Sequence, residues 1–146
     1  MPMASAEAAK DAILKVFADA WATITPTPPK VIYEPVKTDT PDGDEECVMV
    51  IVRHTDGFQP TIGSANGRRF RATGVVWTMV FTPLELNDGG TLALQRAKVI
   101  QDAYEAPPAG GDTVEYRNVR LVEIGPQGAW YRVNVLADFN YDRVKP

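Results

Sequence analysis

The chain has 146 residues, 45% of them hydrophobic and 23% charged, so we expect a single globular domain spanning residues 1–146. A net charge of −4 argues against a general nucleic-acid binder, and a single cysteine excludes an intrachain disulfide. No stretch approaches the ~18 apolar residues of a membrane span. The N-terminus lacks the basic region of a signal peptide, so we expect synthesis in the cytoplasm and no membrane association.

The first predicted element is a helix that begins after Ser5, a residue type favoured at the N-cap. Pro26, Pro28 and Pro29 end it, because proline cannot continue a helix. Its apolar residues recur at helical spacing, which predicts a stripe packed on the core rather than an exposed partner-binding face. The stripe comprises Ile13, Val16, Phe17, Ala20, Trp21 and Ile24.

A short strand is predicted at residues 31–33, and a polar, acidic loop follows at residues 37–46. The loop lacks the alternating ligands of an EF-hand, so a solvated loop is favoured over a calcium site. Residues 47–53 predict a strand with two apolar faces, which we expect to be central and covered on both sides.

Residues 54–66 are rich in turn-forming types and predict a long irregular segment. The next strand begins at the basic run 67–71 and ends near Phe81, with Val75, Trp77, Met79 and Phe81 on one face. Thr91 is the expected N-cap of a second helix that ends before Pro107. The main apolar residues of that helix are Leu94, Ala97, Ile100 and Tyr104.

The C-terminal part predicts a β-hairpin, with a strand near 119–124, a turn at 125–128 and a last strand near 131–141. In that last strand, odd positions from Tyr131 to Tyr141 are apolar and even positions are mostly polar. One face should pack on helices and the other meet water or a partner. The predicted fold is α+β, a mixed, mostly antiparallel β-sheet packed by two α-helices in the order α-β-β-β-α-β-β.

The sequence contains no recognisable catalytic centre, and we predict no enzyme activity, no cofactor and no metal site. His54 is the only histidine, and a strand would separate it from Cys47 by roughly 23 Å if extended. The run 88–91 could offer backbone N–H groups to a phosphate, but an ordinary turn before a helix explains it better.

Arg68, Arg69 and Arg71 form the one concentrated basic cluster. It predicts either a solvated strand end or a contact with another subunit, and DNA contact is a weaker alternative because the chain is acidic. The acidic loop of a neighbouring copy is the candidate partner. The residues predicted to form the subunit or docking interface are therefore Arg68, Arg69, Arg71, Asp42, Asp44 and Glu45.

Segments of the chain resemble tail terminator-like proteins of tailed bacteriophages, over about residues 6–142. The resemblance rests on a pattern of strand ends and turns. It is carried by the runs GRRFRATGVV (67–76), VFTP (80–83), GAWYRVNV (128–135) and FNYD (139–142), with a glycine-containing turn into an alanine-rich helix between the second and third.

The resemblance implies a structural virion protein of the tail or neck, assembled in the bacterial cytoplasm. It implies a homo-oligomeric ring, typically of six copies, that caps the tail tube and stops its polymerisation. The tail tube protein and a head connector or completion protein are the implied partners, and DNA passes through the ring without specific binding. An acidic channel wall would suit that passage, because attraction to phosphate comes from lysine and arginine.

Two other functions stay open from the residues. Another neck component, such as a head-tail connector or tail completion protein, has the same size and class. A monomeric ligand-binding module that uses the last strand is a more distant alternative, and it should contain a concave pocket.

Overall fold

A computed structural model describes residues 5–25, 27–33, 45–58, 68–85, 89–106 and 114–145; the side chains of residues 56, 58, 68, 69, 89 and 143–145 lie outside this description. The two helices are α1 (Ala6–Trp21) and α2 (Gly89–Glu105). The five strands are β1 (Lys30–Tyr33), β2 (Cys47–Phe58), β3 (Arg68–Pro83), β4 (Glu115–Gln127) and β5 (Trp130–Lys145).

The strands form one sheet in the order β1-β2-β3-β5-β4. Only β1 and β2 pair in parallel, and the other three neighbours pair antiparallel. The predicted α+β class, element order and mixed, mostly antiparallel sheet are therefore confirmed.

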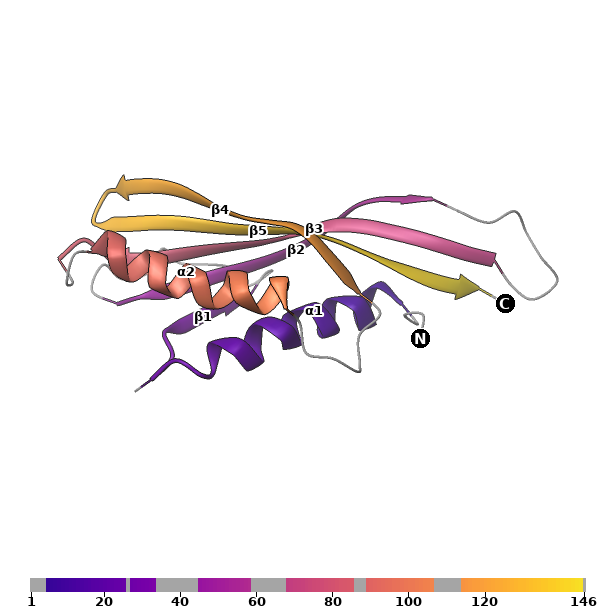
Figure 1. Cartoon of the computed structure of the whole chain (residues 1–146), viewed down its shortest axis with the longest axis horizontal. Helices are drawn as coiled ribbons and strands as arrows, with labels where there is room; N and C mark the ends of the chain where they lie inside the picture. The colour runs from indigo at the N-terminus through magenta and orange to yellow at the C-terminus, as the bar shows by residue number, and fades with distance from the viewer. Residues whose placement is uncertain are drawn as a thin grey trace.

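Both helices lie on the same face of the sheet (Figure 1). Their buried residues meet the inward-facing residues of β2, β3 and β5, which alternate along each strand as the pleat requires. The central rows of this core are Val48–Val80–Val133 and Val50–Thr78–Val135. Thr78 is fully buried, and its hydroxyl donates to the carbonyl of Val135 at 3.0 Å.

Helix α1 forms as its sequence predicts. The hydroxyl of Ser5 accepts a hydrogen bond from the amide of Ala8, so Ser5 is the N-cap. The predicted stripe is buried apart from Ala20, which is partly exposed. The indole of Trp21 donates to the carbonyl of Pro29 at 2.9 Å, which holds the returning chain against the helix before β1 begins.

The irregular segment predicted at 54–66 is wrong at its start, because β2 continues through His54 to Phe58. The backbone of β3 supplies pairing partners for these residues, with Gly57 opposite Ala72, and so overrides their turn-forming composition. A register shift between His54 and Asp56 absorbs one residue. Residues 59–66 lie outside the described residues.

Thr91 is not the N-cap of α2, because the helix already begins at Gly89. Glycine is a poor helix former, but at position 90 it allows close packing. A Cβ atom on Gly90 would lie 3.2 Å from Cζ of Tyr131, so the missing side chain lets the start of α2 approach β5. The predicted apolar residues Ala97, Ile100 and Tyr104 are buried, together with Ala93.

The predicted turn of the C-terminal hairpin is displaced. Residues 125–127 belong to β4, and the turn is Gly128–Ala129. Gly128 has φ +62°, which suits the first central position of a two-residue hairpin turn. Gly125, with φ +90°, instead follows a register shift after Glu123.

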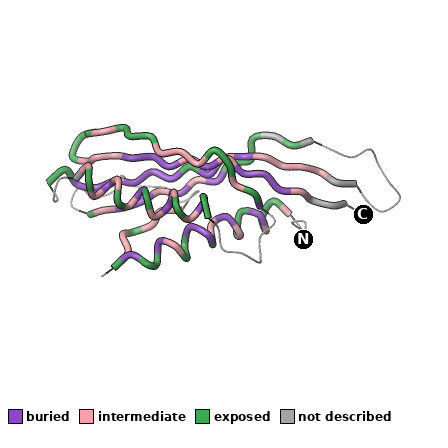
Figure 2. Tube along the Cα trace, in the orientation of Figure 1, coloured by how far each residue is buried: buried purple, intermediate pink, exposed green. Residues whose placement is uncertain are grey.

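The expectation that residues 47–53 are covered on both sides is wrong for the described part of the chain. Strand β2 does lie between β1 and β3, but the described helices cover only the face of Val48, Val50 and Val52. On the opposite face, Met49 and Ile51 are partly exposed. Figure 2 shows buried and intermediate stretches along the strands of the sheet. None of the described helices therefore covers this apolar side of the sheet, although Met79 on it is buried by its neighbours.

Candidate assembly surfaces

The sheet face opposite the helices, here called the open face, is defined by strand register. Its side chains come from alternate positions of β2, β3, β4 and β5. Its apolar members are Met49, Ile51, Val75, Trp77, Met79, Phe81, Val122, Trp130 and Leu136. Its described charged members are Arg53, Arg71, Glu115, Arg117, Arg120, Arg132, Asp138 and Asp142.

An apolar band crosses the middle of the open face. Trp77 lies between Ile51 of β2 and Leu136 of β5 in register, and its side chain is left 41% exposed. The next row contains Met49, the buried Met79 and the buried amide Asn134, and ends at Val122, which is 40% exposed. Exposed apolar side chains gathered on one face are a usual mark of a surface that binds a partner.

Aromatic rings continue the band toward the hairpin turn. Phe81 and Trp130 pack edge to face with their ring centroids 6.1 Å apart. The guanidinium of Arg132 lies 5.5 Å from the centroid of the Phe81 ring, in cation–π contact. Arginine with aromatic residues and methionine is the composition that distinguishes interface cores from ordinary protein surface.

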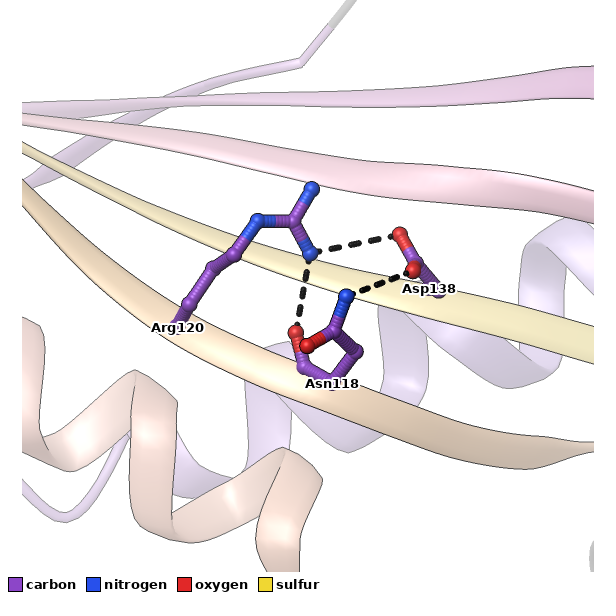
Figure 3. A network of polar contacts seen from close by, with 3 residues as sticks. All are labelled: Asn118, Arg120 and Asp138. Carbon is purple, nitrogen blue, oxygen red and sulfur yellow. Dashed lines mark hydrogen bonds and ion pairs between the residues drawn. The ribbon is translucent and has the colours of Figure 1, made fainter.

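A polar network occupies the open face where β4 deviates from regular pairing (Figure 3). Asn118 has φ +56°, and two residues of β4 are left without register partners there. Its amide donates to Asp138 at 3.2 Å. Arg120 donates to the other oxygen of Asp138 at 3.3 Å and to the carbonyl of Asn118 at 2.9 Å. The network anchors the irregular part of β4 to β5.

Of the predicted interface arginines, Arg71 has a described side chain and already has an acidic partner. It lies directly opposite Asp142 of β5 and forms a two-pronged ion pair with it, at 2.9 and 3.4 Å. Arg68 and Arg69 pair through their backbones with Lys145 and Val144, and their side chains lie outside the described part. This end of the sheet projects beyond the helices (Figure 1).

Of the predicted acidic residues, Asp42 and Asp44 lie outside the described residues, whereas Glu45 is exposed just before β2. Its neighbour Glu46 pairs with Arg96 of α2 at 3.1 Å. The register places the start of β2 beside Phe81, ten residues along β3 from Arg71. At about 3.3 Å per residue, some 33 Å separate the two ends. Glu45 and Arg71 of one copy are therefore too far apart to pair.

The residues considered for catalysis are not arranged for it. Cys47 is buried, and desolvation raises the pKa of its thiol to about 11, so the reactive thiolate is disfavoured. His54 points to the helix side, where Nε2 lies 2.6 Å from the hydroxyl of Tyr141. Among the described side chains, no group of three or more His, Cys, Asp or Glu residues is placed to hold a metal ion.

A small cavity lies between α1 and the strands β1 and β2. It measures about 40 Å³ and is lined by Lys10, Leu14, Tyr33, Val50 and Val52. Ligand pockets usually measure about 300–1,000 Å³, so this cavity has room for water rather than for a metabolite. Neither described helix is long and apolar enough to cross a membrane.

The comparisons with known proteins support the fold. The sequence matches no family model and no curated protein. A solved structure whose name gives no function shares 20% identity, with a TM-score of 0.54 over 94% of this chain and 96% of that one. The likeness shows a shared fold. It spans nearly the full length of both chains.

Sequence reasoning did not identify the open face as one surface. It placed Val75, Trp77, Met79 and Phe81 together, and it assigned Arg132 and Asp138 to the polar side of the last strand. The register adds that these residues share one face, because Trp77 pairs with Leu136 and Phe81 with Arg132. One feature of the sequence did indicate this surface. The strand predicted at residues 47–53 has two apolar faces, and the sequence predicts only two helices to cover them.

Proposed function

We propose that the chain is a structural subunit of a bacteriophage tail, a terminator that forms a ring on the tail tube. The ring would stop addition of tube protein and would present a surface for the head's connector or completion protein. DNA would pass through it without specific binding.

The observation that carries this proposal is the one-sided cover of the sheet. Two helices bury one face, while no described helix covers the other, apolar and arginine-rich face. A chain with that surface is suited to permanent assembly, because burying apolar area stabilises a contact by roughly 25 cal/mol per Å². The runs that resemble tail terminators fall mainly on β3 and β5, which are neighbours in the middle of this sheet.

The same observation bears on the alternatives. A ligand-binding module needs a concave pocket, and among the described residues the cavity between α1, β1 and β2 is too small to hold a metabolite. A head-tail connector or tail completion protein would equally need an open assembly face. It remains the second candidate, and tail length distinguishes it from a terminator.

The experiment is electron microscopy of a phage lysate in which the gene for this chain alone is disrupted. A terminator predicts overgrown tails of variable length alongside filled, unattached heads. Tails of normal length that fail to join heads would indicate a connector or completion protein instead. Complementation with the wild-type gene is the control, and intact infectious particles without the gene would contradict both functions.

A further inference from the structure

The open face differs in charge from the rest of the chain. Its described side chains include five arginines and three carboxylates, a net charge of +2. The whole chain carries −4, so the remaining residues together carry −6. No lysine occurs among the described side chains of the open face; the lysines with described side chains belong to α1, α2 and β1.

This charge asymmetry restricts how two copies can meet. Two open faces placed against each other would oppose ten arginines with six carboxylates, and like charges brought together in an interface cost several kcal/mol. An open face placed against another part of a second copy would meet the acidic remainder. The favoured contact therefore joins two different patches, and such a contact repeats around a ring or along a filament.

We infer that the open face is the docking surface for a second copy of this chain, which contributes a different, acidic surface, so that the contact is head-to-tail. Trp77 lies at the centre of the apolar band and is the expected energetic anchor, because interface hot spots are enriched in tryptophan and arginine. The inference rests on the proposed ring function and adds which surface closes the ring.

Duplex DNA is the other acidic partner that an arginine-rich face could bind. The centre of the face is aliphatic and flanked by ion pairs, with Ile51 and Leu136 on either side of Trp77. Arg71 and Arg120 are already held by Asp142 and Asp138, which would repel phosphate. A protein surface that excludes water fits this band better than a nucleic acid does.

The test is sedimentation velocity of the purified full-length chain across concentration, from about micromolar to several hundred micromolar. The wild type should form oligomers larger than dimers, and Trp77→Glu should shift the protein to monomer with at least a tenfold weaker association. Val122→Glu gives a second variant at a separate exposed site on the same face. Gln95→Glu is the matched control, because it adds the same charge to an exposed position of α2 and should leave association unchanged. Circular dichroism of each variant establishes that the fold is retained.

Unchanged oligomers in both folded face variants would overturn the inference, as would a wild type that stays monomeric throughout or stops at a symmetric dimer. If the wild-type monomer binds duplex DNA and the face variants do not, the partner of the open face is nucleic acid and not a second copy. The tail-length experiment stays separate. If tails overgrow without the gene but Trp77→Glu leaves the oligomers unchanged, the terminator function stands and this docking surface is rejected.

Discussion

The hydroxyl of Tyr104 lies between the two helices, 1% exposed, and donates to the backbone carbonyl of Ile13 at 3.1 Å. Burial raises the pKa of this phenol well above its ordinary value, so the group stays a neutral donor throughout the physiological range. The bond fixes α2 against the middle of α1. A single atom therefore contributes to the relative placement of two elements.

Replacing Tyr104 with phenylalanine should lower the free energy of unfolding by about 1 kcal/mol, because one buried hydrogen bond is lost while the ring still fills its site. Tyr104→Ala should cost about 3–5 kcal/mol, since it also leaves a cavity. Urea denaturation of the three proteins measures both values. Equal stability of wild type and Tyr104→Phe would mean that the hydroxyl contributes nothing to helix placement.

His54 gives the molecule a pH-dependent contact. Partial desolvation against Phe139 and the nearby charge of Lys10 lower its pKa below the usual 6.5, although the residue as a whole is exposed, so the folded protein favours the neutral ring. The unfolded chain then binds more protons, and the contribution of His54 to stability is present above about pH 6.5 and is lost as the pH falls below it. Between pH 7.5 and 5.5 the wild type should therefore lose more stability than His54→Gln. Parallel urea denaturation at the two pH values checks this, and identical losses would contradict it.

At the scale of elements, the close approach of β2, β3 and β5 depends on a residue without a side chain. A Cβ atom on Gly74 would collide with the backbone carbonyl of Arg53 and lie 2.5 Å from Cζ of Phe139. Gly57 of β2 has space, since a Cβ there would meet only the carbonyl of Arg71 at 3.6 Å. The two glycines lie on paired strands but have different structural roles.

We expect Gly74→Ala to destabilise the fold by about 1–3 kcal/mol or more, because neither a backbone carbonyl nor a packed ring can yield without disturbing the sheet. Gly57→Ala, the matched control, should have little effect. Thermal unfolding followed by circular dichroism compares the two, and a Gly74→Ala protein as stable as Gly57→Ala would show that the strands can separate there at little cost.

Element type followed from the sequence wherever a local pattern was strong. The spacing of Ile13, Phe17 and Trp21 predicted α1, and the alternation in β5 predicted which face of that strand is buried. The predicted ends of elements were wrong where a strand distant in sequence supplies the hydrogen bonds, as at His54–Phe58, whose partners lie on β3. The predicted position of the hairpin turn was wrong because Gly125 has a positive φ but does not reverse the chain. Composition cannot distinguish a bulge from a turn when both favour glycine.

At the scale of the whole molecule, the two ends of the long strands carry different chemistry. Arg71 and its ion pair with Asp142 lie at the end that projects beyond the helices, and Glu45 lies near the other end. The sequence predicted both groups but could not place them, because distance along a sheet depends on register. Since the two ends cannot meet within one copy, any pairing of Glu45 with Arg71 must join two copies, as a head-to-tail ring requires.

An exchange of charges at Arg71 and Asp142 separates a role within the chain from a role between copies. Arg71→Asp alone should lower the free energy of unfolding modestly, because it places two carboxylates opposite each other on β3 and β5. Adding Asp142→Arg restores an opposite-charge pair and should recover stability in urea denaturation. If Arg71 also contacts a neighbouring copy, the exchanged protein should still form rings less well in sedimentation velocity, because its guanidinium now projects from β5. Recovery of both stability and assembly would confine Arg71 to its own chain and leave the apolar band around Trp77 as the surface that joins the copies.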